Sequence, residues 1–245
     1  SRFIESIAYA VSARSREKKF RQFLDLMHPT PEASLLDVGV NTREYSLTDN
    51  YLEKHYPFPS RITAVGLEDG RAFSERYPDI TYRQTTLGTP LPFPDHAFTF
   101  VYSNAVIEHV GRHAEQLFFL QELMRVARHG YVTTPNRYFP VETHTRVPLL
   151  HILLPKRIFD RTLIWIGKSW ATGDYMHCLS GNELRALCHE AGLHDFTLIP
   201  NRFCGLTLTW TLYGTPPLKI GRSLLASKYR LESDFLVVPS RVPLR

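Results

Sequence analysis

The chain has 245 residues and a mass of 28.3 kDa, which is enough for a core that needs no disulfide or metal to hold it together. Apolar residues make up 43% and charged residues 22%, so the composition is that of a globular domain and excludes a disordered or fibrous protein. The formal net charge of +5 does not by itself identify an anionic partner.

The three cysteines, Cys178, Cys188 and Cys204, are odd in number and lack CxxC spacing. They predict neither a disulfide framework nor a metal site, and they fit a reducing compartment. The most apolar run, residues 147–155, is about half as long as a membrane-spanning helix. Because no secretory leader is evident either, we expect a cytoplasmic protein without a bound metal.

Residues 1–30 are predicted to form a helical lead-in. Phe20, Phe23, Leu24 and Met27 recur at helical spacing and define an apolar stripe. We interpret the basic residues around this stripe as a solvated face of the helix: Arg14, Arg16, Lys18, Lys19 and Arg21.

From Ser34 onward, short apolar runs alternate with helical segments, which is the pattern of an α/β protein with a parallel sheet and helices on both faces. Strands are predicted at residues 34–39, 61–67, 80–86, 98–103, 131–134, 194–199 and 234–238. Helices are predicted at residues 49–55, 73–77, 113–128 and 179–191. The last helix has the signature of a capping box, because Ser180 precedes it and Glu183 follows three residues later.

We expect one domain over residues 1–245, because no repeat and no low-complexity linker divides the chain. A cofactor-binding half spans residues 34–135, and two insertions follow, at residues 136–178 and 201–233. Six basic and nine acidic residues lie between Ser34 and Asn104, so the positive excess of the chain lies outside this stretch.

Ligands of open parallel sheets bind beyond the carboxyl ends of the strands, so the residues just after each strand are candidate contacts. Gly39, after the first strand, lets the backbone approach a ligand closely. Glu68 and Asp69, after the second strand, can accept hydrogen bonds from both ribose hydroxyls of a nucleoside. The other candidates at these strand ends are Asp37, Val40, Asn41, Thr86, Leu87, Asn104 and Ala105.

Four segments carry a family resemblance: LLDVG, VGLED, LPFPDHAFTFVYSNAVIEHV and VTTPNRYFP. Together they resemble a class I S-adenosylmethionine-dependent methyltransferase of the small-molecule, type 11 kind. The resemblance covers roughly residues 34–136. It implies a Rossmann-like, seven-stranded, mostly parallel sheet with an antiparallel last strand, and S-adenosyl-L-methionine as the cofactor. The expected antiparallel strand is residues 234–238.

The chain departs from the family pattern at three positions. Asn41 replaces a glycine of the first loop, and asparagine is the residue that best tolerates a left-handed backbone there. Thr86 stands where an aspartate commonly binds the adenine amino group, and Thr99 stands where an aspartate often begins the fourth strand.

Methyl transfer from a sulfonium is an in-line displacement, so the protein chiefly has to position the acceptor in a dry pocket. A base is needed only when the acceptor loses a proton, and histidine titrates near neutral pH. The candidate bases are His109, just beyond the fourth strand, and His144, in the insertion after the fifth. We expect a small-molecule acceptor that is methylated at oxygen or nitrogen.

Two other functions stay open at this stage. The basic N-terminal helix favours a methyltransferase that acts on RNA or protein, but no recognisable nucleic-acid-binding module accompanies it. The changes at Asn41 and Thr86 favour a non-catalytic binding subunit with a degenerate methyltransferase fold.

The insertion at residues 136–178 holds too many aromatic and aliphatic residues for a solvated loop. These residues form either a lid over an apolar acceptor pocket, a homodimer contact, or a peripheral contact with a membrane. Four basic residues flank the apolar run, and they either hold an anionic acceptor or keep the segment in water: Lys156, Arg157, Arg161 and Lys168.

Overall fold

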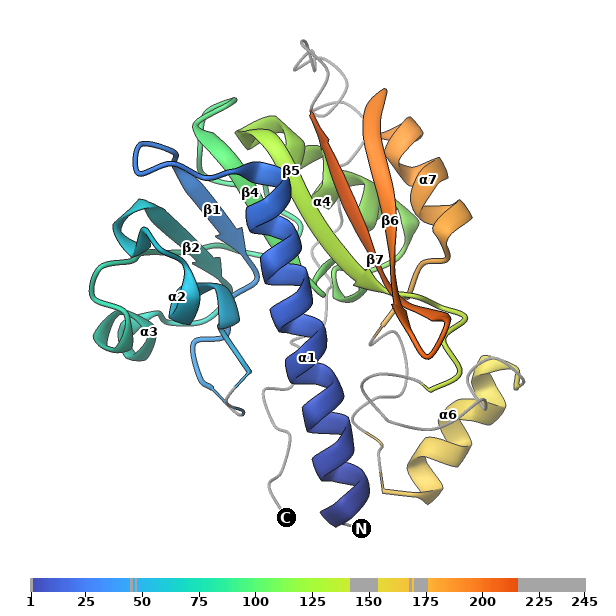
Figure 1. Cartoon of the computed structure of the whole chain (residues 1–245). Coiled ribbons are helices and arrows are strands. Elements are labelled where there is room, and N and C mark those ends of the chain that lie inside the picture. Colours follow the sequence, from blue (N-terminus) through green and yellow to red (C-terminus); the bar gives the residue numbers. More distant parts are fainter. Residues whose placement is uncertain are drawn as a thin grey trace.

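The computed structural model of the chain describes residues 2–44, 46, 48–141, 154–167, 169 and 176–215. Within these residues the strands form one sheet in the order β3-β2-β1-β4-β5-β7-β6 (Figure 1). The strands are β1 (Leu35–Val38), β2 (Ile62–Gly66), β3 (Thr81–Gln84), β4 (Phe98–Asn104), β5 (Ala127–Pro135), β6 (Asp195–Phe203) and β7 (Leu206–Thr215). All neighbours pair in parallel except β7, which is antiparallel to both β5 and β6. The predicted mostly parallel, seven-stranded sheet is confirmed.

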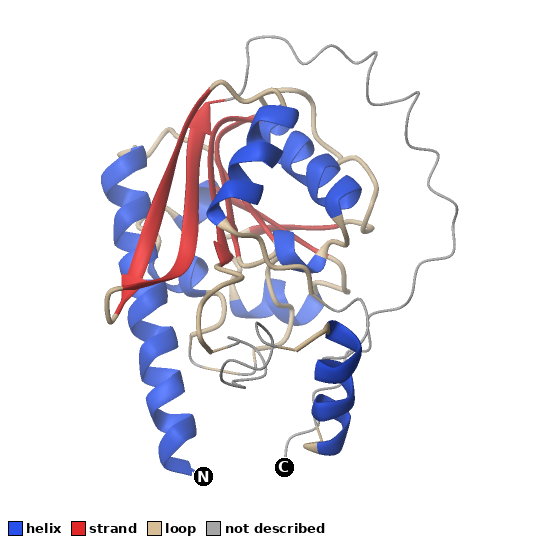
Figure 2. Cartoon of the chain, turned by 90° about the vertical axis from the view of Figure 1, so that its right-hand side faces the viewer, coloured by secondary structure: helices blue, strands red, loops and turns tan. Residues whose placement is uncertain are grey.

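Helices cover both faces of this sheet (Figures 1 and 2). The helices are α1 (Arg2–Met27), α2 (Tyr51–His55), α3 (Arg71–Arg76), α4 (His113–Val126), α6 (Lys156–Trp165) and α7 (Gly181–Glu190), with short 3-10 turns η1 (Pro59–Arg61) and η2 (Ile107–His109). One core cluster lies under α1, α2 and α3 and includes Phe23, Phe73 and Tyr131. The other lies under α4 and α7 and includes Leu120, Leu187 and Leu212. The sheet is therefore packed on both faces, which fixes the positions of its strand ends.

The antiparallel strand is not where the sequence predicts it. β7 lies at Leu206–Thr215, inside the range expected as the second insertion, and the expected strand at residues 234–238 lies outside the described residues. A two-residue turn joins β6 to β7, since Phe203 pairs with Leu206 and both turn residues have positive φ, Cys204 at 49° and Gly205 at 79°. These angles are those of a type I′ hairpin turn, whose twist matches that of the flanking strands.

The junction of α4 with β5 and the helix α6 also differ from the prediction. α4 ends at Val126, not at residue 128, and β5 begins at once with Ala127, which pairs with Phe98 of β4. The ladder with β4 thus overrides the helical pattern there. The helix α6 was not predicted; it begins directly after Pro155, a residue that favours the start of a helix. The capping box of α7 is confirmed, because Ser180 Oγ accepts from the amide of Glu183.

Among the described residues, no helix is both long and apolar enough to cross a bilayer. A search of the same residues finds no cluster of three or more His, Cys, Asp or Glu with the geometry to hold a metal ion.

Candidate functional site

The loops after β1 and β4 meet at the point where the strand order reverses, as in other doubly wound sheets. Gly39 has φ of 103°, and its amide donates to the carbonyl of Val65 at 2.9 Å. A Cβ at position 39 would lie 2.3 Å from Cγ2 of Val106. Ala105, just before Val106, has φ of 60°, a conformation that costs energy for any residue with a side chain. Positive φ angles at Gly39 and Ala105, where two loops meet closely, are typical of a ligand site.

The loop after β1 is held by Asn50, a residue that sequence reasoning missed. The amide of Asn41 donates to Asn50 Oδ1 at 3.0 Å, and Asn50 Nδ2 donates back to the Asn41 carbonyl at 2.8 Å. Asn50, with φ of 50°, takes the left-handed conformation, whereas Asn41 is not among the residues with positive φ. The tolerance of asparagine for a left-handed backbone is therefore not used at Asn41, and the loss of a glycine there costs no backbone strain.

Glu68 and Asp69 make different contacts. Thr42 Oγ1 donates to Glu68 Oε2 at 2.7 Å, which draws the exposed Glu68 carboxylate to the loop after β1. Asp69 instead accepts from Arg71, at 2.7 Å from its Nε and 3.1 Å from its amide, and these hydrogen bonds lower the pKa of Asp69. Of the two predicted ribose acceptors, Glu68 is therefore the one at the strand-end site.

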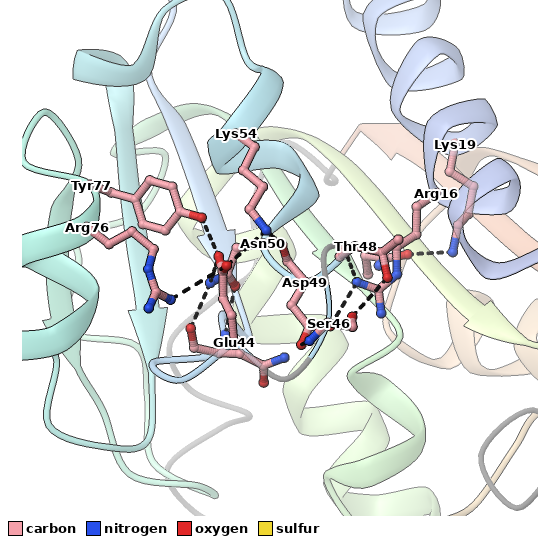
Figure 3. A network of polar contacts seen from close by, with 12 residues as sticks. Arg16, Lys19, Glu44, Ser46, Thr48, Asp49, Asn50, Lys54, Arg76 and Tyr77 are labelled. Atoms are coloured by element: carbon pink, nitrogen blue, oxygen red, sulfur yellow. Dashed lines mark hydrogen bonds and ion pairs between the residues drawn. The ribbon is translucent and has the colours of Figure 1, made fainter. Parts of the chain in front are cut away.

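A network around Glu44 fixes the far side of the same loop (Figure 3). The carboxylate lies 3.0 Å from Lys54 Nζ and 3.6 Å from Arg76 Nη1, and the hydroxyl of Tyr77 donates to it. Burial pushes the pKa of Glu44 up, but the hydrogen bonds from Tyr77 and Lys54 outweigh burial and hold the pKa below its usual value. The network ties the loop to α2 and to the end of α3.

Asp37, predicted to touch the cofactor, is buried and pairs with a second buried acid, Glu53 of α2. Burial and the neighbouring Glu53 carboxyl raise the pKa of Asp37 well above its ordinary value. Burial also raises the pKa of Glu53. Two adjacent buried carboxyls cannot both ionise at low cost, so the pair keeps a proton to a higher pH than an ordinary carboxyl does.

The end of β4 carries a buried polar cluster. Asn104 Oδ1 accepts from Lys19 Nζ at 2.6 Å and from Thr133 Oγ1 at 2.7 Å. Close by, Glu108 is fully buried and accepts from Thr134 Oγ1 at 3.1 Å. Glu108 raises the pKa of Lys19, because a nearby negative charge stabilises the ammonium form. The cluster thus joins α1, β4 and β5 at one point.

Lys19 corrects the prediction that all basic residues of the first helix are solvated, because only 5% of this residue is exposed. Burial, with a smaller contribution from Arg16, lowers the pKa of Lys19 to about 8. The signal was present in the spacing: Lys19, Phe23 and Met27 recur every four residues, which places the lysine on the apolar stripe of the helix. Arg16, one turn earlier, reaches Asp49 at 3.3 Å (Figure 3).

The remaining predicted residues lie as follows. His109 is partly exposed on η2, with Nε2 at 3.9 Å from Glu108 Oε1. His144 lies outside the described residues. Thr86 and Leu87 form an exposed turn in which Thr89 donates to the Thr86 carbonyl. This turn follows β3, the edge strand beside β2, at the same carboxyl edge of the sheet.

A cavity of about 460 Å³ opens at the carboxyl end of β5, beside the start of α7. Asn136, Tyr138 and Trp210 contribute to its lining, together with Arg185. The described residues predicted for the cofactor do not line it, so this cavity adjoins the strand-end site without being part of it.

S-adenosyl-L-methionine fits the residues at the strand ends. Gly39 lets the loop after β1 pack closely against Val106, since a Cβ there would lie 2.3 Å from Val106 Cγ2, and Glu68 presents an exposed carboxylate at hydrogen-bonding reach of the same loop. A sulfonium nucleoside needs both a close backbone approach and an acceptor for its ribose hydroxyls.

Comparisons with known proteins agree with this geometry. Residues 36–132 match the family described as Methyltransferase domain, Methyltransf_11. No curated protein matches the chain. Among solved structures, a SAM-dependent methyltransferase of Aquifex aeolicus aligns with a TM-score of 0.53 and 14% identity, over 85% of this chain and 96% of its own. A SAM-dependent methyltransferase of Methanosarcina mazei aligns with a TM-score of 0.52 and 15% identity, over 79% of this chain and 98% of its own. Residues 36–132 are thus similar to the methyltransferase family, and the two solved structures share the fold of the chain.

Proposed function

We propose that the chain transfers a methyl group from S-adenosylmethionine to an oxygen or nitrogen atom of a small molecule, and that the acceptor binds against Lys19. The observation that carries this proposal is the hydrogen bond of 2.6 Å that the buried Lys19 donates from Nζ to Asn104 Oδ1, at the carboxyl end of β4. Lysines are rarely buried unless they are paired, because removing the charge from water is costly. A buried lysine at a strand end is therefore a candidate functional residue.

The position of α1 supports a small acceptor. This helix lies along the sheet, and its N-terminal turns extend past the carboxyl ends of the strands (Figure 1). Its Lys19 side chain reaches inward to Asn104, so the helix forms a wall on one side of the site. A site with a wall on one side favours a small molecule over the surface of a folded RNA or protein.

The chemistry assigned to the chain's own residues is modest. When bound, S-adenosylmethionine supplies a methyl carbon, which bonds to the acceptor atom as its bond to sulfur breaks. Gly39 and Glu68 hold the donor, and Asn104 orients the amine of Lys19. With its pKa lowered to about 8, Lys19 is partly neutral at physiological pH and takes the proton that the acceptor loses. His109 and His144 stay predicted bases.

Action on RNA or protein is the second candidate, and a non-catalytic binding subunit is the third. A homodimer and a cytoplasmic location also stay predictions.

The acceptor class is tested with S-adenosylmethionine that is radiolabelled on its methyl group. The purified full chain is incubated with the small-molecule, RNA and protein fractions of a cell extract, and incorporated label is counted. We expect label in the small-molecule fraction. Label that enters only RNA or only protein would overturn the proposed acceptor class.

The role of Lys19 is tested with the acceptor found in this way. Lys19→Met and Lys19→Arg should both lower kcat by about 10² to 10⁴, because neither side chain exchanges a proton near pH 8. Lys18→Met is the matched control, since Lys18 is exposed on the same helix, and its rate and pH profile should equal those of the wild type. A Lys19→Arg variant with wild-type activity would show that the charge alone matters and would contradict a base.

A further inference from the structure

The helix α6 presents an unusual outer surface. Trp165 is 87% exposed, and Ile164 and Ile158 are 58% and 48% exposed. Arg157 and Arg161 are exposed as well. Large apolar side chains in such number on one short helix are uncommon on a protein surface that contacts only water.

Helical spacing gathers these side chains on one side of α6. Arg157, Arg161 and Trp165 recur every four residues, and Ile158 lies seven residues before Trp165. Leu163, in contrast, is fully buried, so it anchors the opposite side of the helix to the protein. We call the outer group Arg157, Ile158, Arg161, Ile164 and Trp165 the α6 ridge.

We infer that the α6 ridge docks on the surface of an anionic lipid bilayer. Tryptophan and isoleucine side chains enter the boundary between headgroups and acyl chains, and tryptophan prefers that boundary. Arginines beside them pair with lipid phosphates and attract the negatively charged surface. A ridge that combines both kinds of side chain complements an anionic bilayer in charge and in polarity.

A second copy of the chain fits the same ridge less well. In a two-fold symmetric contact the ridge would pack on itself, so Arg157 and Arg161 would face the same two arginines. A ten-residue helix also offers much less than the roughly 800 Å² per partner that a stable interface buries. Nucleic acid would pair with the arginines but would leave the isoleucines without an apolar partner.

The helix α6 lies at the same end of the molecule as the strand-end site. Figures 1 and 2 both place α6 at the end of the molecule where the N-terminal turns of α1 extend past the strand ends. A bilayer that contacts the α6 ridge would therefore lie on the same end of the molecule as the strand-end site. This inference does not depend on the identity of the acceptor.

The experiment is flotation of the full chain with two sets of vesicles, one of phosphatidylcholine and one of phosphatidylcholine mixed with phosphatidylglycerol. We expect flotation with the mixed vesicles, and loss of it in high salt, because charge attraction is screened. Absence of flotation, or equal flotation with both compositions, would overturn the inference.

Variants locate the contact. Arg157→Gln/Arg161→Gln should weaken partition by about tenfold or more, and Trp165→Ala should also weaken it. Arg61→Gln and Arg128→Gln, exposed at the amino ends of β2 and β5 on the opposite edge of the sheet, are matched controls and should float as the wild type does. An equal loss in the controls would overturn the inference, as would a dimer that Trp165→Ala abolishes. Retained binding of S-adenosylhomocysteine by each variant shows that the fold and the donor site are intact.

Discussion

Lys19 shows how one buried charge links stability to function at the scale of a residue. Its ammonium group is almost inaccessible to water, and its pKa falls to about 8 from 10.5. A lowered pKa means that the folded state binds the proton less tightly than the unfolded chain does. The free energy of unfolding should therefore rise with pH between about 8 and 10.5, and below pH 8 the buried charge is a cost.

Lys19→Met should accordingly be more stable than the wild type at pH 7, by about 1 to 3 kcal/mol, while it loses methyl transfer. Urea unfolding of both proteins at pH 7 and pH 10 measures this difference, which should shrink at the higher pH. A variant that is less stable at pH 7 would show that the lysine has a structural role instead.

At the scale of elements, the strand-end loops depend on one glycine. Gly39→Ala places a Cβ 2.3 Å from Val106 Cγ2 and also forces a side chain to adopt φ of 103°. We expect a loss of about 1 to 3 kcal/mol in stability and a loss of S-adenosylhomocysteine binding. Gly39→Ala/Val106→Ala removes the clash but keeps the backbone strain, so it should recover only part of both. Full recovery in thermal unfolding and calorimetry would contradict the role given to the backbone.

The elements differ in how well the sequence predicts them, for physical reasons. β1, β2 and β4 are buried on both faces, so they appear as continuous apolar runs that are easy to recognise. β7 alternates, as in LTLTWTLYGT, and depends on a hairpin turn at Cys204 and Gly205 that was assigned to an insertion. The candidate site follows the same rule: Gly39 and Glu68 come directly after predicted strands, whereas Lys19 and Asn50 come from elements that only the tertiary fold brings near.

For the whole molecule, the buried pair Asp37 and Glu53 makes stability depend on pH. Because the pKa values of both acids are raised, the folded state binds more protons than the unfolded chain above pH 4.5. This contribution to stability is present at low pH and is lost as the pH rises through the folded-state values. Lys19 does not obscure this trend below about pH 7, where it is mostly charged in both states.

Asp37→Asn mimics the protonated acid, so its melting temperature should fall less steeply than that of the wild type as the pH rises from about 4.5 to about 7. The difference between the two proteins should grow with pH across that window. Parallel melting curves would show that the pair does not hold a proton. Asp37→Asn should also keep its affinity for S-adenosylhomocysteine, because the side chain faces Glu53; a large loss would support the direct cofactor contact predicted from the sequence.

We place the donor between the loop after β1 and Glu68, and calorimetric titration of S-adenosylhomocysteine into the full chain tests this placement. We expect saturable binding that Glu68→Ala weakens by about 10- to 100-fold, because the carboxylate no longer accepts from the ribose hydroxyls. Asp69→Ala, whose carboxylate is engaged by Arg71, should stay within about threefold of the wild type. No binding at millimolar ligand in a folded sample, or an unchanged affinity in Glu68→Ala, would contradict this placement.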